Sequence, residues 1–154
     1  STRGHRFGWV IEAWENRSEN TVVETPYEAL ILASIIEKET AVPEERGRIA
    51  GVFTRRLEKG MRLQTDPTVI YGIEDYDGNI RRSDLRRDTP YNTYTRAGLP
   101  PTPIAMPSRA AIKAALDPAP GDALYFVSRG DGSHVFSDSL SEHNRAVDKY
   151  QRGS

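Results

Sequence analysis

The stretch LASIIEKET, residues 32–40, joins an apolar run to two glutamates and a lysine. Just upstream, TPYE at residues 25–28 has a hydroxyl residue at the cap, proline at the first helical position and glutamate three residues after the cap. These signals predict a helix over residues 25–40 whose last turn carries both carboxylates. The placement of those carboxylates on the helix decides which of them could take part in chemistry.

The two glutamates of this turn are not equivalent. At about 100° per residue, Glu37 and Glu39 point about 200° apart, so they cannot face each other across one sugar ring. Glu39 extends the apolar stripe of the helix, seven, four and three residues after Leu32, Ile35 and Ile36, whereas Glu37 continues a more mixed face. A carboxyl group on an apolar stripe is desolvated, which raises its pKa and suits a general acid. A purely structural role, such as pairing with an arginine of the next helix, also fits this pattern.

The rest of the chain alternates helices with a long turn-rich segment. A second helix is predicted from Pro43 to Gly60, because acids follow its proline and basic residues precede its glycine. Residues 61–73 indicate an extended piece, a turn at Asp66-Pro67 and then a short helix or strand. Residues 74–107 contain five prolines and predict a long ordered loop region with room for short strands.

Two further helices and a hairpin complete the expected fold. A helix is predicted from Ser108 to Leu116 and another from about Ser139. Between them, ALYFVS and HVFS flank RGDGS at residues 129–133, which is typical of a β-hairpin. We therefore predict an α+β fold: a helix-rich single domain with a long ordered loop region and a small β-hairpin.

The ends of the chain lack periodicity. STRGHRFG at residues 1–8 and QRGS at residues 151–154 are expected to be frayed. We assign residues 1–24 to an extension leading into the domain, with residues 1–4 a candidate remnant of cloning. The domain itself is expected over residues 25–151, followed by a tail at 152–154.

Composition restricts the class of protein. The chain has 154 residues, 37% hydrophobic and 28% charged, which indicates a soluble globular domain. A net charge of −1 disfavours nucleic acid as a partner. The longest apolar stretch, residues 29–36, is too short to span a bilayer and no signal peptide opens the chain, so a membrane anchor would lie outside this sequence. The absence of cysteine leaves the compartment open.

Four segments together resemble one known family. They are residues 31–73, which include EKET and MRLQTDPTVIYG; TPYNTYTRAGLPPTPIAMPS at 89–108; LYFVSRGDGSHVFS at 124–137; and EHNRAV at 142–147. In this order they resemble the YceG-like family, the endolytic murein transglycosylases of the MltG type, over residues 25–150. Members of that family carry a membrane helix and a LysM-like region ahead of the catalytic part. The resemblance implies a single-pass anchored enzyme of cell-wall biogenesis, facing the periplasm or the outer face of the cytoplasmic membrane.

The resemblance also implies a reaction and its acid. The family's catalytic glutamate is the second of EKET, which is Glu39 here, and the hydroxyl residue after it is Thr40. A lytic transglycosylase cuts the bond between N-acetylmuramic acid and N-acetylglucosamine, and the muramyl C6 hydroxyl attacks its own C1 to form a 1,6-anhydro ring. One carboxyl group suffices, because the nucleophile is already tethered. It acts first as acid and then as base.

Polar residues of the matched motifs are the candidates for binding glycan: Gln64, Thr65, Asp66, Tyr91, Asn92, Thr93 and Tyr94. Some could instead be structural, since an aspartate before proline can cap a turn and an asparagine can hold a loop. Glu37 is a supporting candidate, either orienting the site or forming a salt bridge. A water-using muramidase with Asp66 as its second carboxylate, and a non-catalytic glycan-binding module, are alternative functions.

No metal or other cofactor is expected. His134 and His143 lie on different predicted elements, without further ligands at the spacing of a metal site. The tripeptide at residues 129–131 is interpreted as a chance match to an adhesion motif, and the arginines at 81, 82, 86 and 87 as a solvated face. By resemblance, the expected partners are peptidoglycan strands and the glycan polymerases that make them.

Overall fold

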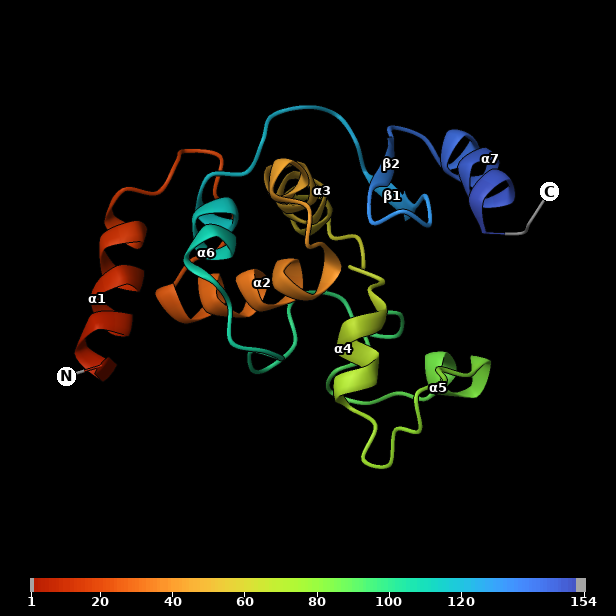
Figure 1. Ribbon diagram of the computed structural model, residues 1–154, viewed down its shortest axis with the longest axis horizontal. Coiled ribbons are helices and arrows are strands. Elements are labelled where there is room, and N and C mark those ends of the chain that lie inside the picture. Colours follow the sequence, from red (N-terminus) through yellow and green to blue (C-terminus); the bar gives the residue numbers. More distant parts are fainter. Residues whose placement is uncertain (1, 152–154) are drawn as a thin grey trace.

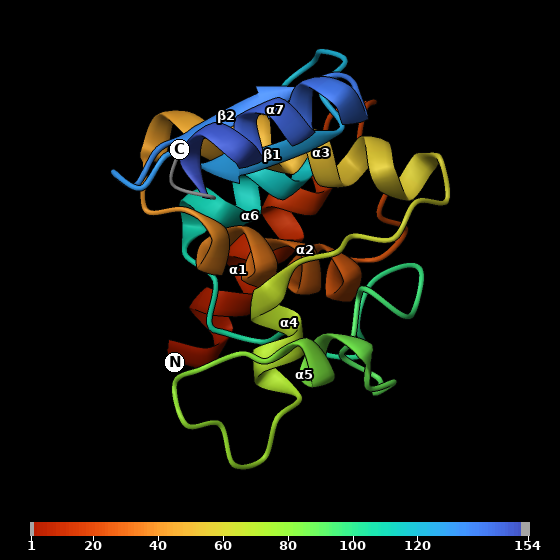
Figure 2. The same ribbon diagram turned by 90° about the vertical axis from the view of Figure 1, so that its right-hand side faces the viewer.

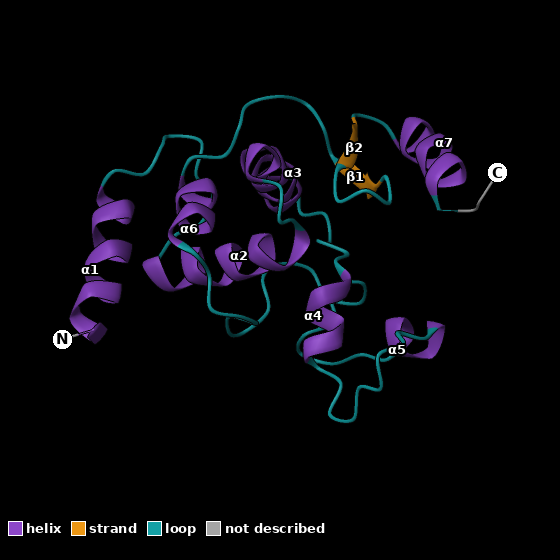
Figure 3. Cartoon of the chain, viewed as in Figure 1, coloured by secondary structure: helices purple, strands orange, loops and turns teal. Residues whose placement is uncertain are grey.

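The computed structural model describes residues 2–151, with side chains from residue 8 onward. Within them lie seven α-helices, one 3₁₀ turn and one antiparallel hairpin (Figures 1 and 3). The elements are α1 (Thr2–Glu15), α2 (Pro26–Glu39), the 3₁₀ turn (Pro43–Glu45), α3 (Arg46–Glu58), α4 (Asp66–Tyr71), α5 (Arg82–Arg86), α6 (Arg109–Leu116), β1 (Tyr125–Ser128), β2 (His134–Ser137) and α7 (Leu140–Tyr150). The predicted helix-rich α+β fold with a small hairpin is confirmed.

Helix α2 is the centre of the core. It begins as predicted, because the backbone N–H of Glu28 donates to the hydroxyl of Thr25 at 3.1 Å. Leu32, Ile35 and Ile36 are fully buried, each worth roughly 1.5–3 kcal/mol of burial. Helices α1, α3 and α6 pack around α2 (Figure 1), so the direction of α2 is fixed from several sides. Its C-terminal end, which carries the two glutamates, is the end nearest α4.

The start of the chain differs from expectation. Residues 2–8 were expected to be frayed, but their backbone forms the first part of α1. The helix packs on α2 and α6, and Val10 is buried in the shared core. After α1 the chain stays attached to α6, since Ser18 N and Thr21 Oγ1 both donate to Leu116 O at 2.8 Å. Periodicity misses this helix because, among its described side chains at residues 8–15, only Val10 is buried. Residues 152–154 of the predicted tail lie outside the described residues.

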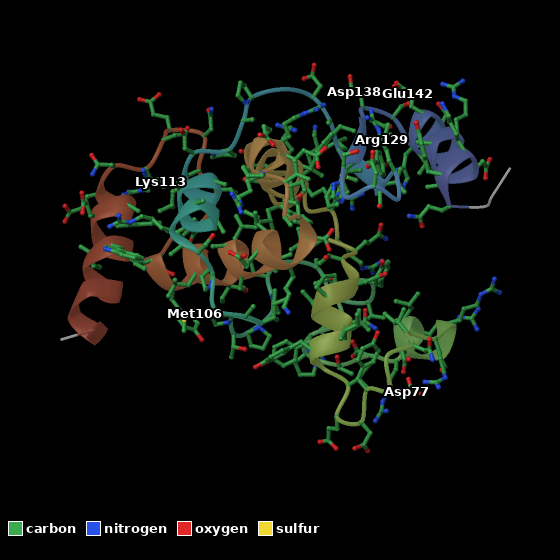
Figure 4. The ribbon with its side chains drawn as sticks, viewed as in Figure 1. Asp77, Met106, Lys113, Arg129, Asp138 and Glu142 are labelled. Atoms are coloured by element: carbon green, nitrogen blue, oxygen red, sulfur yellow. The ribbon has the colours of Figure 1, made fainter. Side chains whose placement is uncertain are left out.

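The turn-rich segment forms a lower region around α4 and α5. The alternative of helix or strand after Asp66-Pro67 resolves as helix α4, and the short strands considered within residues 74–107 are absent from this described segment, where α5 forms instead. Asp77 lies at the far end of this region in the loop between α4 and α5 (Figure 4), and its carboxylate pairs with Arg81 at 2.6 Å. The basic cluster therefore lies away from the core.

The hairpin and α7 form an upper region on the other side of α2. Strands β1 and β2 pair antiparallel with Tyr125 opposite Ser137 and Ser128 opposite His134, which confirms the predicted hairpin. The tripeptide at residues 129–131 lies in its exposed turn, where Figure 4 labels Arg129. Helix α7 packs on both strands, yet none of its residues is buried. Figures 1 and 2 show the hairpin and α7 together, with the end of α2 between them and α4.

Candidate active site

A cleft of about 1040 Å³ lies at the C-terminal end of α2. The lower region lines it with Gln64, Asp66 and Tyr94, and the upper region lines it with residues of β1, β2 and α7. Glu39 and Thr40, at the C-terminal end of α2, line the same cleft and precede both groups in the chain. The first and last lining residues in sequence are Glu37 and Gln151, which are more than 110 positions apart. The fold therefore brings distant parts of the chain together around the last turn of α2.

The carboxyl group of Glu39 lies in this cleft and is desolvated. Its Oε1 accepts a hydrogen bond from Thr65 Oγ1 at 3.0 Å. Oε2 makes no hydrogen bond with the described residues and is not one of their buried unpartnered atoms, so it remains accessible. Although residue 39 as a whole is half-buried, protein atoms crowd its carboxyl end. Burial raises the pKa of Glu39 to about 7, helped by the charge of Asp66 and opposed by the Thr65 hydrogen bond.

Thr65 is held in place by a buried hydroxyl network. It occupies the N-cap position of α4, yet its side chain does not cap that helix and instead reaches Glu39. Its N–H donates to Thr93 Oγ1 at 3.0 Å, and its carbonyl accepts from Thr68 Oγ1 at 3.0 Å. All three threonines are buried. Because hydrogen bonds hold both the N–H and the carbonyl of Thr65, its hydroxyl has a fixed position from which it can orient the carboxyl group of Glu39.

Asp66 and Tyr94 form a second polar pair in the cleft. The phenol of Tyr94 donates to Asp66 Oδ1 at 2.5 Å. Burial, together with this carboxylate, raises the pKa of Tyr94 above its ordinary value, so the phenol keeps its proton. Asp66 itself is exposed. It is the first residue of α4, at the position where the sequence predicts a turn at Asp66-Pro67. The pair presents both a carboxylate and an aromatic ring to a ligand.

Gln64 has a strained backbone at the edge of the cleft. Its φ of +52° makes it the only non-glycine residue with positive φ in the described part of the chain. Its N–H donates to Thr93 O at 3.2 Å, and its side chain is exposed while Leu63 and Thr65 on either side are buried. Such strain is found most often where a side chain must be aimed at a ligand.

Three of the predicted contact residues lie away from the cleft. Asn92 is 1% exposed, and its amide donates to three backbone carbonyls of residues 84–87 while its Oδ1 accepts from Tyr94 N at 2.8 Å. Thr93 belongs to the buried network under Thr65. The Tyr91 hydroxyl bonds to Thr102 at 2.7 Å. These side chains build the loop that presents Tyr94, and the loop-holding alternative raised for asparagine matches the geometry of Asn92.

Thr40 and Glu37 line the cleft, and each also accepts a backbone hydrogen bond that stabilises the end of α2. The Thr40 hydroxyl accepts from Val42 N at 2.9 Å and so shapes the turn after α2. Glu37 Oε1 accepts from Ser108 N at 2.7 Å, just before α6. That bond lowers the pKa of Glu37, so it stays charged. The salt bridge considered for Glu37 is not formed within the described residues.

The upper wall contains residues that sequence reasoning did not select. The buried guanidinium of Arg56 and the ring of Tyr125 line the cleft. His134 pairs through Nδ1 with the buried Glu45 at 2.8 Å, and His143 stacks on Tyr125 at 5.0 Å between ring centroids. Among the described side chains no three His, Asp or Glu residues form a group that could hold a metal ion. The apolar and aromatic alternation of residues 124–137 was the available signal, but it predicts only a hairpin.

None of the helices in the described residues combines the length and apolar character that crossing a bilayer requires. The chain itself resembles known proteins along most of its length. The model of the YceG-like family matches residues 5–149.

Two curated relatives and one solved structure agree with that match. The endolytic murein transglycosylase of Bacillus subtilis is 41% identical over 140 residues, which is 91% of this chain and 39% of the relative. That of Streptococcus pneumoniae is 36% identical over 85% of this chain and 24% of its own length. A crystal structure from Listeria monocytogenes, described as a YceG-like protein, has 44% identity and a TM-score of 0.71 over 78% of this chain and 38% of that one. The chain thus spans well under half of these relatives, and it belongs to the YceG-like family.

Proposed function

We propose that this chain is the catalytic domain of an endolytic murein transglycosylase, with Glu39 as general acid and then general base. The observation that carries the proposal is a protonatable carboxyl group with a pKa of about 7 in a large cleft. Family membership supports the same reaction class, since both curated relatives have this name. Among the candidates of the sequence motif, Glu39 is the one whose carboxyl group is accessible and desolvated.

In the proposed reaction, protonated Glu39 gives its proton from Oε2 to the glycosidic oxygen of N-acetylglucosamine. The bond from that oxygen to muramyl C1 breaks through an oxocarbenium-like transition state. The resulting Glu39 carboxylate takes the proton of the muramyl C6 hydroxyl as O6 bonds to C1. Thr65 holds Oε1 throughout, so that Oε2 stays directed to the cleft. Both partners of the second step belong to one sugar, which removes much of the entropic cost.

We propose different roles for the remaining motif residues. Gln64, Asp66 and Tyr94 contact the glycan, because an amide, a carboxylate and an aromatic face suit hydroxyl, acetamido and ring groups. Tyr91, Asn92 and Thr93 act behind them as positioning residues. Glu37 and Thr40 shape the end of α2 from either side.

One observation favours a second candidate, a water-using muramidase. The Asp66 carboxylate lies close enough to Glu39 to raise its pKa, and its side chain is exposed in the same cleft. A second carboxylate near the acid could activate a water. Tyr94 already donates a hydrogen bond to one oxygen of Asp66, so that oxygen is engaged and less available to a water, which favours the lytic route.

Mass spectrometry of products separates these reactions. The protein and its Glu39→Gln variant are incubated with uncrosslinked glycan strands. We expect internal cleavage to fragments ending in 1,6-anhydromuramic acid with the parent protein and none with the variant. Fragments one water heavier would make the protein a muramidase. Glycan binding without any cleavage would favour the binding module instead.

The proposed function also sets the cellular context. Peptidoglycan lies outside the cytoplasmic membrane, so the domain would act at that face or in the periplasm, attached through a segment beyond this sequence. Glycan polymerases, whose product is the proposed substrate, are the proposed partners.

A further inference from the structure

Arg56 is a buried cation in the upper wall of the cleft. It is 6% exposed and lies on α3. Its Nε donates to Leu124 O at 2.7 Å and its Nη1 to Arg62 O at 2.6 Å, while the guanidinium covers the Tyr125 ring at 4.9 Å. These bonds use neutral carbonyls, so they satisfy donors without neutralising the charge.

The neighbouring Arg55 has nearby carboxylates, which Arg56 lacks. Arg55 also donates to carbonyls of the segment before β1, from Nε to Ala123 O at 2.8 Å and from Nη1 to Ala119 O at 3.2 Å. The carboxylates of Asp122, Glu58 and Asp138 stabilise its charge. Among the described residues no carboxylate is close enough to stabilise the charge of Arg56, and burial lowers its pKa. A buried cation without a carboxylate is costly, which points to an anion that is supplied from outside.

One nitrogen of Arg56 is open to such an anion. Nη2 makes no hydrogen bond with the described residues, and it is not among their buried unpartnered atoms. Because Arg56 lines the cleft, its small exposed fraction faces that space. Glu39, Tyr94 and Arg56 all line this one cleft, so a ligand that reaches the acid can also reach the guanidinium.

We propose that Arg56 forms an anion subsite that binds a carboxylate carried by the muramic acid residue of the substrate. The inference rests on the proposed function and names the chemical group that the site selects. Muramic acid differs from glucosamine by a lactyl group on the same ring as the scissile C1. That group is a free carboxylate in peptide-free glycan. When a peptide is attached, the lactyl group is an amide and the carboxylates are those of the peptide. A guanidinium suits either source, since it donates paired hydrogen bonds to planar oxygens.

The first test changes the ligand and leaves Arg56 intact. Binding is measured by calorimetry to the Glu39→Gln protein, in which we expect turnover to be suppressed. The ligands are peptide-free tetrasaccharide, its lactyl methyl ester, peptide-bearing tetrasaccharide and a neutral N-acetylglucosamine tetramer. If the lactyl group is the source, the free acid binds at least about tenfold tighter than the ester and the neutral tetramer. If the peptide is the source, acid and ester bind alike and the peptide-bearing ligand gains that factor.

The second test changes the protein in the same background. Arg56→Gln should remove the preference for carboxylate while leaving the affinity for the neutral tetramer within about twofold. Arg55→Gln is the matched control, because it loses equivalent carbonyl contacts on the same helix but does not line the cleft. Arg56→Lys keeps the charge and should retain part of the preference.

The outcomes separate this inference from the proposed function. Equal binding of ligands with and without carboxylate, or an unchanged preference in Arg56→Gln, would overturn the subsite even if the parent protein still forms anhydro ends. A carboxylate preference that depends on Arg56, without any cleavage by the parent protein, would support the subsite and contradict the enzymatic proposal. Should Arg56→Gln fail to fold, the ligand series alone decides.

Discussion

Two glutamates on the last turn of α2 contact different parts of the fold. Glu37 contacts the start of α6, and Glu39 contacts the segment before α4. At the α6 contact, Glu37 accepts a backbone N–H from Ser108, and its pKa is lowered. At the α4 contact, Glu39 meets only the hydroxyl of Thr65 in a desolvated pocket, and its pKa is raised to about 7. Two chemically identical groups on one helical turn therefore have opposite proton affinities, because different elements pack against them.

Substituting the two glutamates separately should have its largest effect on the rate of glycan cleavage. Glu39→Gln should lower kcat/KM for glycan cleavage by about 10²–10⁴-fold, which is what a positioned general acid contributes. Glu37→Gln, the matched change on the same turn, should stay within about threefold. The measurement is the initial rate of anhydro-end formation. Comparable losses in both variants would show that the two sites are not functionally distinct.

Glu39→Gln should also increase the free energy of unfolding at alkaline pH. A folded-state pKa above the ordinary value favours the protonated native state, so the parent protein loses stability as pH rises from about 4.5 to about 7. Glu39→Gln removes this loss, and chemical denaturation at pH 8 should show a gain of about 3 kcal/mol. At pH 4 the gain should be near zero. A gain of equal size at both pH values would point to packing rather than to proton linkage.

Removing the hydroxyl that contacts Glu39 should have a smaller effect. Thr65→Val keeps the shape of the side chain but loses its bond to Oε1, so we expect about a tenfold lower kcat/KM. Because that bond lowers the pKa of Glu39, the alkaline limb of the pH–rate profile should move to higher pH. Thr65→Ser should restore both the rate and the profile. A lower rate with an unshifted limb would assign Thr65 a role in packing only.

The smallest effect is expected at the other carboxylate. Glu37→Gln weakens the bond to Ser108 N and should cost about 0.5–1 kcal/mol of stability at pH 7. A lowered pKa contributes stability that is present above about 4.5 and is lost as pH falls through the folded value. The difference from the parent should therefore shrink in thermal melts at pH 3. A cost that persists there would come from the shape of the amide.

Local signals predicted much of the fold. The caps at Thr25, Ser108 and Ser139 all accept the expected backbone N–H groups, and the RGDGS turn lies between paired strands. These features depend on residues within a few positions of one another. Helix α1 was missed, since its attachment to α2 and α6 depends on residues far along the chain.

The candidate site was predictable only in part. Helical spacing distinguishes Glu39 from Glu37 without any knowledge of other elements, and the structure gives them different environments. Spacing could not separate Tyr94, which faces the cleft, from its neighbour Asn92, which holds the loop from inside. It also could not find Arg56, because the lack of a carboxylate beside a guanidinium exists only once α3 and β1 are packed together.

Titration of the two glutamates shows most directly whether Glu39 is protonated, and Glu37 ionised, near neutral pH. The carboxyl carbons of Glu37 and Glu39 are followed by NMR from pH 3 to pH 9, with Glu37→Gln and Glu39→Gln to assign the signals. We expect a midpoint near 7 for Glu39 and one below 4.5 for Glu37. If Glu39 also titrates at or below 4.5, it is ionised at neutral pH and cannot be the acid of this cleft.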